Sequence, residues 1–346
     1  MGQMDRYHRQ MLLPAISAAG QAKLACAHVL LIGCGALGCG IADQLARAGI
    51  GHLRIVDRDI VELTNLQRQC LFDETDARDG TPKASAAANR LRAINSSIAI
   101  EPVVADVHSG NIEELAGMDG QRVDLVLDGT DNAETRYLIN DMCVKHDIPW
   151  VYGACVGTTG RVMVIQPGQS ACLRCIFPQP PTAGELPTCD TAGVLGSAAM
   201  IVASLQAVEA IRLLTGNGSN QNLLTMDLWT GRFHSVETNE RQKDCFSCIQ
   251  RNFEFLDAPL EQSAIQLCGR TAVQIRPPRP QSINLVELAE RLNPIAAMQQ
   301  HELFLRCQPM NEKGIDLTIF ADGRVLVRGT TDITQARTLV SKYVGS

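Results

Sequence analysis

The sequence predicts an α/β protein in which a doubly wound, mostly parallel β-sheet with an antiparallel extension is followed by a small α+β domain. Two observations carry this prediction. Short aliphatic runs typical of buried parallel strands alternate with helix-length amphipathic segments as far as residue 155, and one of these runs leads directly into a glycine-rich turn. At 346 residues with 45% hydrophobic content, the chain can form one large domain and a smaller one.

The glycine-rich turn follows an aliphatic run at residues 28–32 and opens a helix predicted over residues 36–48. A second strand, residues 52–56, ends in Asp57, about twenty residues past the turn, where a carboxylate commonly holds a ribose hydroxyl. These features predict a mononucleotide site in a Rossmann-like domain, with a dehydrogenase as the default function. The turn fits G-x-G-x-x-G through Gly33, Gly35 and Gly38.

The loop after Asp57 changes that default. It adds Asp59, Asn65, Arg68 and Gln69 within a few residues of one another. Two acids, two amides and a guanidinium suit a triphosphate better than a nicotinamide.

Three further polar groups are expected at the same edge of the sheet. Lys83 lies just inside a helix start, after Pro82 at a position that favours helix initiation. Asp128 and Asp131 end and follow a predicted strand at residues 124–128, with Asn132 beside them. Ligands of open α/β sheets bind at the carboxyl ends of strands, so we expect these side chains at the nucleotide site.

The remaining elements complete the alternation. A strand at 161–165 is expected to be antiparallel and to lie at the sheet edge, and a long helix is expected to start near residue 192. The expected helices and strands between the turn and that edge are 83–94, 98–104, 109–116, 124–128, 133–146 and 149–153; those of the last domain are 273–276, 285–292, 302–306, 315–320, 324–328 and 333–344.

Two CxxC pairs predict a four-thiolate zinc site. The pairs are Cys172 with Cys175 and Cys245 with Cys248. Four thiolates make a closed, structural tetrahedral site. The separation of the pairs is long for a compact zinc ribbon, so two redox motifs remain the alternative from spacing alone.

Composition excludes several function classes. A net charge of -6 and a pI near 5.7 give no reason to expect nucleic acid as a partner. The longest apolar segment, residues 192–205, is too short to span a bilayer, and the N-terminus has no secretory pattern. We therefore expect a cytoplasmic protein without a membrane partner.

Several motifs occur together in one order along the chain: residues 6–10, the glycine turn, 64–69, 130–132 with 135–136, the CxxC pairs and 192–196. In this order they resemble the ThiF/MoeB-like adenylyltransferases of the ubiquitin-activating superfamily. The resemblance covers about residues 5–250 and divides the chain into an adenylyltransferase domain at 1–250 and an α+β domain at 251–346. The first would comprise an arm (1–25), a nucleotide-binding core (26–155), and a crossover loop, zinc site and long helix (156–250).

The resemblance implies an activity. Such enzymes use ATP to adenylate the C-terminal glycine of a small ubiquitin-like sulfur-carrier protein of the MoaD or ThiS type, which ends in Gly-Gly, and release pyrophosphate. They act as homodimers with Mg²⁺ and Zn²⁺. The pathway, such as molybdopterin or thiamine biosynthesis, is not readable from the sequence.

The resemblance also implies residue roles. Arg9 would reach the partner subunit's nucleotide, while Arg68 and Lys83 bind phosphates and Asp131 holds Mg²⁺. Cys189, in a loop that ends at a helix N-terminus, would form a covalent link to the carrier. The nucleotide would further contact Gly33, Gly35, Gly38, Asp57, Asp59, Asn65, Gln69, Asp128 and Asn132.

Other interpretations stay open at this point. Arg9 also fits a solvated helix face, Cys189 an idle thiol, and Lys83, Asp128 and Asp131 taken singly fit helix caps or solvated charges. For the whole chain, the alternatives are an NAD-dependent oxidoreductase and an inactive nucleotide-binding zinc scaffold. The last domain has no rhodanese-type cysteine loop, and its role is undecided.

Overall fold

The computed structural model describes residues 6–181, 189–259, 264–266, 272–277, 282–301 and 303–345. The chain forms two compact units, Met1–Ala258 and Pro259–Ser346, so the division lies eight residues beyond the one expected from the sequence. Each unit has its own hydrophobic core.

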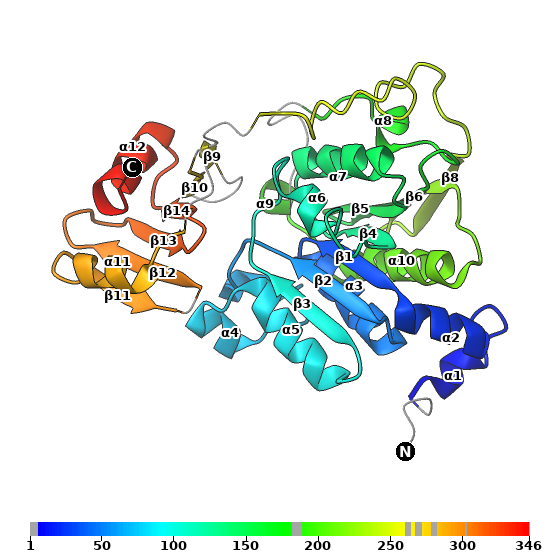
Figure 1. Cartoon of the computed structure of the whole chain (residues 1–346), viewed down its shortest axis with the longest axis horizontal. Coiled ribbons are helices and arrows are strands. Elements are labelled where there is room, and N and C mark those ends of the chain that lie inside the picture. Colours follow the sequence, from blue (N-terminus) through cyan, green and yellow to red (C-terminus); the bar gives the residue numbers. More distant parts are fainter. Residues whose placement is uncertain are drawn as a thin grey trace. The chain divides into compact units, whose positions relative to one another are not determined.

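The first unit alternates strands and helices along most of its length (Figure 1). Its elements are α1 (His8–Met11), α2 (Ser17–Cys26), β1 (His28–Ile32), α3 (Ala36–Ala48), β2 (His52–Val56), a 3-10 turn η2 (Leu63–Asn65), α4 (Glu74–Asp79), α5 (Lys83–Ile94), β3 (Ala99–Val103), α6 (Ile112–Leu115), β4 (Leu125–Asp128), α7 (Ala133–Lys145), β5 (Trp150–Val156), β6 (Thr159–Ile165), α8 (Leu173–Ile176), α9 (Cys189–Ala192), α10 (Gly196–Thr215), β7 (Asn222–Asp227) and β8 (Arg232–Glu237).

The described strands of this unit form one eight-stranded sheet in the order β3-β2-β1-β4-β5-β6-β7-β8. The pairs from β3 to β5 are parallel and those from β5 to β8 antiparallel. The prediction that residues 161–165 form the edge is wrong, because β7 and β8 continue the sheet. All six residues of β8 are exposed, so this strand lacks the hydrophobic alternation by which a strand is recognised.

Helices cover both faces of the sheet. Successive side chains of β1 point to opposite sides: Val29 and Leu31 belong to a core shared with α3, α5 and α10, whereas Leu30 and Ile32 belong to a second core shared with α6 and α7. Figure 1 shows these two sets of helices on opposite sides of the strands. The predicted doubly wound architecture is confirmed.

The long helix α10 begins later than expected. α9 ends at Ala192, Gly193 takes a left-handed conformation (φ +74°), and α10 starts at Gly196. It is 20 residues long and apolar enough to cross a membrane by length and composition alone. The sequence analysis had judged the apolar segment at 192–205 too short for this. Half of the apolar stretch of α10 is buried, and the helix packs on α3 and β5 as a core helix does.

The N-terminal arm is fastened to the C-terminal end of α3. The ring of Tyr7 lies against Gly49, which ends that helix in a left-handed conformation. Gln10 Nε2 donates a hydrogen bond to the carbonyl of Ala48 at 3.0 Å. The arm is thus held at the end of α3 that lies farthest from the glycine turn.

In the described residues, the second unit is an antiparallel sheet with two helices. The described strands run in the order β11-β12-β13-β14-β10-β9, and Asn284 and Asp332 cap the two helices through their side-chain oxygens. The predicted α+β composition is confirmed, whereas β9 and β11 were not anticipated. The elements are β9 (Ala264–Gln266), β10 (Ala272–Ile275), α11 (Leu285–Leu292), β11 (Ala296–Gln300), β12 (Phe304–Pro309), β13 (Asp316–Phe320), β14 (Val325–Arg328) and α12 (Ile333–Tyr343).

Candidate nucleotide site and cysteine cluster

The predicted polar residues converge because three neighbouring strands end together. The central strand β1 pairs Ile32 with Val56 of β2 on one side and with Asp128 of β4 on the other. The segments that follow these strands are the glycine turn, the loop from Asp57, and the loop from Gly129. They meet at the carboxyl edge of the sheet, where open α/β folds bind ligands.

The motif glycines have two different roles. A Cβ on Gly38 would lie 2.0 Å from the carbonyl oxygen of Gly33, and one on Gly33 would lie 2.7 Å from the carbonyl oxygen of Gly129. These backbones touch, so no side chain fits. A Cβ on Gly35 would meet only Gln69 Nε2, at 3.9 Å. Gly35 therefore keeps open space at the N-terminus of α3, where backbone amides attract phosphate.

Asp57 holds the glycine turn in place. One carboxylate oxygen accepts a hydrogen bond from the Cys34 N–H at 2.6 Å, and the other accepts from the Asp59 N–H at 2.7 Å. Burial raises the pKa of Asp57, and nearby Lys83 partly opposes this effect. The carboxylate retains lone pairs for a further donor such as a ribose hydroxyl.

Lys83 is brought to the loop after β2 by backbone pairing. The Lys83 N–H donates to the Asp59 carbonyl at 2.9 Å, and Ile60 forms a bridge with Pro82. Lys83 is buried, and its Nζ lies 3.0 Å from the carboxylate of the partly exposed Asp59. The ammonium is therefore held at the site by a partly buried ion pair rather than solvated on a helix face.

The segment around η2 presents an amide and a guanidinium. Asn65 is buried, and its side-chain oxygen accepts from the Glu62 N–H at 3.0 Å, which makes it part of a helix cap. Gln69 is also buried, and its Oε1 has no hydrogen-bond partner among the described residues. Arg68 is half-buried and donates to the Thr64 carbonyl at 2.8 Å. Asn65 thus shapes the loop, while Gln69 faces Gly35.

Asp128 is used within the protein. It is fully buried and accepts hydrogen bonds from the Thr130 N–H and hydroxyl and from Arg136 Nε, at 2.7–3.0 Å. Burial raises its pKa, and Arg136 opposes the rise. Asn132 caps α7 through the Glu134 N–H at 2.9 Å. Asn132 is thus the residue that caps the helix, and Asp128 holds the loop after β4 in place through Thr130 and Arg136.

Asp131 is the exposed carboxylate that this loop presents. Burial lowers the pKa of Arg58 and Arg136, but neighbouring acidic groups more than offset it; Asp131 contributes to this rise behind Asp106 and Asp59 at Arg58, and behind Asp128 and Tyr152 at Arg136. Asp131 is therefore an exposed acid in a region that also holds two guanidinium groups.

Arg9 lies away from the other predicted residues. It is exposed in α1, at the far end of α3 from the glycine turn. Cys189 is the first residue of α9, and residues 182–188, the end of its predicted loop, lie outside the described part of the chain.

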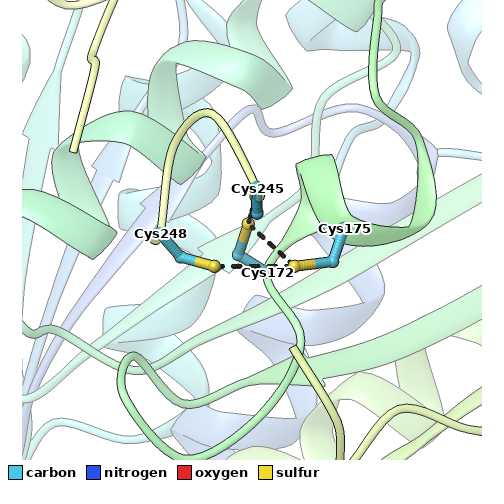
Figure 2. A group of neighbouring side chains, drawn as sticks. All are labelled: Cys172, Cys175, Cys245 and Cys248. Carbon is cyan, nitrogen blue, oxygen red and sulfur yellow. Dashed lines mark hydrogen bonds between the residues drawn. The ribbon is translucent and has the colours of Figure 1, made fainter. Parts of the chain in front are cut away.

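The four CxxC cysteines come together in the interior (Figure 2). The Sγ–Sγ distances are 3.8 Å for Cys172–Cys175, 3.6 Å for Cys172–Cys245 and 3.5 Å for Cys175–Cys248. Tetrahedral zinc with bonds of about 2.3 Å separates its sulfur ligands by about 3.8 Å. The cluster therefore fits zinc, and its joining of the two pairs argues against two separate redox motifs.

Three residues that shape the site were given no role in the sequence analysis. Gly129 makes the close backbone contact with the glycine turn, and Arg136 ties Asp128 to the carbonyls of Thr130 and Gly153. Arg58 pairs with Asp106 at 3.1 Å. Gly129 was recognisable as a glycine after a buried strand, but nothing near Arg58 in sequence points to Asp106.

The fold and the site define a class: an α/β protein of nucleotide-binding type with a cluster of four cysteines that joins the segment after β6 to the segment after β8. Residues 7–247 match the family model described as the ThiF family. The chain belongs to this family.

Curated relatives cover the chain to different extents. The sulfur carrier protein ThiS adenylyltransferase of Bacillus subtilis (strain 168) is 40% identical over 342 residues, which is 98% of this chain and 99% of the relative. The SAMP-activating enzyme E1 of Haloferax volcanii is 39% identical over 71% of this chain and 89% of its own length. The adenylyltransferase and sulfurtransferase MOCS3 of Sus scrofa is 39% identical over 71% of this chain and 53% of its own length. Both units therefore have a counterpart in the first relative.

Among solved structures, E. coli MccB with ATP superimposes with a TM-score of 0.61 and 23% identity, covering 70% of this chain and 74% of that one. This likeness supports the fold.

Proposed function

We propose that this protein adenylates the C-terminal glycine of a small ubiquitin-like sulfur-carrier protein, with ATP as the donor and pyrophosphate as the leaving group. The observation that carries the proposal is the single edge of the sheet at which an open glycine turn, a buried Lys83 and an exposed Asp131 meet. The relative that matches both units is named for adenylating such a carrier.

The chemistry needs alignment and charge neutralisation more than a general base. A C-terminal carboxylate is already ionised at neutral pH, so it can attack the α-phosphorus directly. Gly35 and the α3 N-terminus would receive phosphate, Lys83 and Arg68 would neutralise it, and Asp57 would hold the ribose. Mg²⁺ prefers carboxylate and phosphate oxygens and would be held by Asp131, where it supplies charge neutralisation.

Arg9 can serve this site only from another chain. α3 has 13 residues and is therefore about 20 Å long, and the arm is fastened at its distal end through Tyr7 and Gln10. That distance exceeds the length of an arginine side chain, so Arg9 would reach the nucleotide of a partner subunit in a homodimer. A guanidinium supplied in this way can stabilise charge on the transferring phosphate.

The four cysteines would hold zinc as a structural ion, since all four positions are filled by protein sulfur. Cys189 would take the activated carrier as a thioester after adenylation: its thiolate attacks the acyl-adenylate carbonyl and AMP leaves. This step follows the adenylation and is separable from it.

The test uses the zinc-loaded full-length chain. In the presence of ATP, the chain is expected to capture a small protein ending in Gly-Gly in a pull-down. That carrier is expected to stimulate ATP–pyrophosphate exchange by the chain. Asp131→Ala should abolish exchange without unfolding, because the residue is exposed. Cys189→Ser should retain exchange but lose any thiol-sensitive carrier adduct.

Three outcomes would contradict parts of the proposal. Carrier-independent hydride transfer with NAD would indicate an oxidoreductase. ATP binding without exchange, in the presence of a captured carrier, would indicate a nucleotide-binding scaffold. Exchange without an adduct in the wild-type protein would remove Cys189 from the mechanism and leave adenylation intact.

A further inference from the structure

Helix α7 contacts both cysteine-bearing loops but contributes no cysteine to the cluster. Corresponding cysteines of the two CxxC pairs lie 73 positions apart in the chain, and each pair encloses a short loop. Helix α7 passes beside both loops and turns Asn140 and Asp141 toward them. Both residues are fully buried.

Asn140 bridges the two loops directly. Its Oδ1 accepts a hydrogen bond from the Leu173 N–H at 2.9 Å, inside the Cys172–Cys175 pair. Its Nδ2 donates to Ser247 Oγ at 3.1 Å, inside the Cys245–Cys248 pair. The backbone donor at Leu173 fixes which end of the amide is the oxygen, so the other end must donate to Ser247.

Asp141 completes the chain of hydrogen bonds. Ser247 Oγ donates to one carboxylate oxygen at 3.0 Å, and the Phe255 N–H donates to the other at 3.0 Å. Ser247 thus receives from Asn140 and donates to Asp141, which uses its hydroxyl in both directions. The loop that carries Cys245 and Cys248 is thus held at Ser247, and the segment that follows it is held at Phe255.

The burial of Asn140 and Asp141 is compensated by the hydrogen bonds of this network. An amide and a carboxylate without partners would each cost several kcal/mol in the interior, whereas here they join two distant segments. The same helix carries Arg136, which ties Asp128 at the nucleotide site. Helix α7 therefore holds the two cysteine loops and also supports the loop after β4, which carries Asp131.

We propose that Asn140 and Asp141 are positioning residues of the zinc site, which hold the two CxxC loops at ligand spacing through Leu173 N–H and Ser247 Oγ. The inference rests on the zinc assignment of the proposed function, and its test needs neither ATP nor carrier. Outer-shell residues of this kind typically change metal affinity about 10- to 100-fold when removed.

The experiment measures zinc affinity of the full-length chain by competition with a chromophoric chelator. Asn140→Ala is expected to lose about 10- to 100-fold in zinc affinity. The matched control is Asn95→Ala, which removes another fully buried amide, one that donates to Tyr7 and the Ala46 carbonyl far from the cysteines. The control is expected to bind zinc as the wild type does.

Ser247→Ala is the second variant, because it deletes only a hydroxyl and leaves the backbone of its loop intact. We expect a smaller loss of zinc affinity in the same direction. Unchanged affinity in Ser247→Ala, or equal losses in Asn140→Ala and Asn95→Ala, would overturn the proposal. A wild-type chain that binds no zinc would overturn the metal assignment itself, while leaving the adenylation test unaffected.

Discussion

A paired substitution can separate the glycine that serves the fold from the glycine that serves the ligand. In Gly38→Ala the new methyl group would lie 2.0 Å from the Gly33 carbonyl oxygen. Backbone cannot move aside as a flexible side chain can, so the cost is expected at the upper end of the 1–3 kcal/mol typical of overpacking, or roughly 3 kcal/mol. For a unit of this size, that corresponds to a fall in Tm of roughly 6–12 °C.

Gly35→Ala is expected to leave stability nearly unchanged. Its methyl group would meet only Gln69 Nε2, at 3.9 Å, which is an ordinary contact. Replacing glycine by alanine lowers the conformational entropy of the unfolded chain, which stabilises the folded state by about 0.4–1 kcal/mol. Alanine is a poorer N-cap for α3 by a similar amount, so the two effects nearly offset.

The same methyl group would occupy the space that phosphate needs. An overpacking cost of about 1–3 kcal/mol on the bound state corresponds to roughly 5- to 150-fold weaker ATP binding. Thermal unfolding of both variants and calorimetric titration of Gly35→Ala with ATP measure the two effects. Wild-type ATP affinity in Gly35→Ala, or an unchanged Tm in Gly38→Ala, would refute this division of roles.

Three further predictions concern the dimer, the acid and the metal. Mixed Arg9→Ala and Asp131→Ala chains should recover about a quarter of wild-type activity, because half of randomly paired dimers are mixed and each has one complete site; no recovery after verified subunit exchange would contradict action in trans. Burial raises the pKa of Asp141 to about 6, so the folded protein retains this proton better than the unfolded chain. Relative to Asp141→Asn, the wild type should therefore gain roughly 2 kcal/mol of unfolding free energy as pH falls from about 7 to 4, and a constant difference in denaturant titrations would contradict it. Chelation of zinc held a thousandfold above its Kd should cost about 4 kcal/mol of stability, measured by urea unfolding, and an unchanged midpoint would indicate an unmetallated cluster.

Local patterns predicted the nucleotide half of the fold well. The helix at 83–94 and the strands at 28–32 and 52–56 have the expected ends, because their signals lie within a few adjacent residues. The polar residues of the site converge for the same reason, since parallel strands bring their carboxyl ends to one edge.

What the sequence did not reveal depends on contacts between distant segments. β8 was missed because it is exposed throughout, and β7 was missed because only two of its six residues are buried, so neither strand alternates clearly between polar and apolar residues. The internal use of Asp128 depends on Arg136, and the roles of Asn140 and Asp141 depend on loops more than 30 and 100 residues away. A polar pair in the middle of a helix carries no local sign of its partners.

The backbone contact among Gly33, Gly38 and Gly129 sets a limit on how this pocket can be redesigned. These three positions fix the spacing between two loops with main-chain atoms, so a mutant library that varies them would sample mainly destabilised chains. Gly35 and Gln69 face the open side instead. To alter the ligand preference of the pocket, Gly35 and Gln69 should be varied while Gly33, Gly38 and Gly129 are kept unchanged.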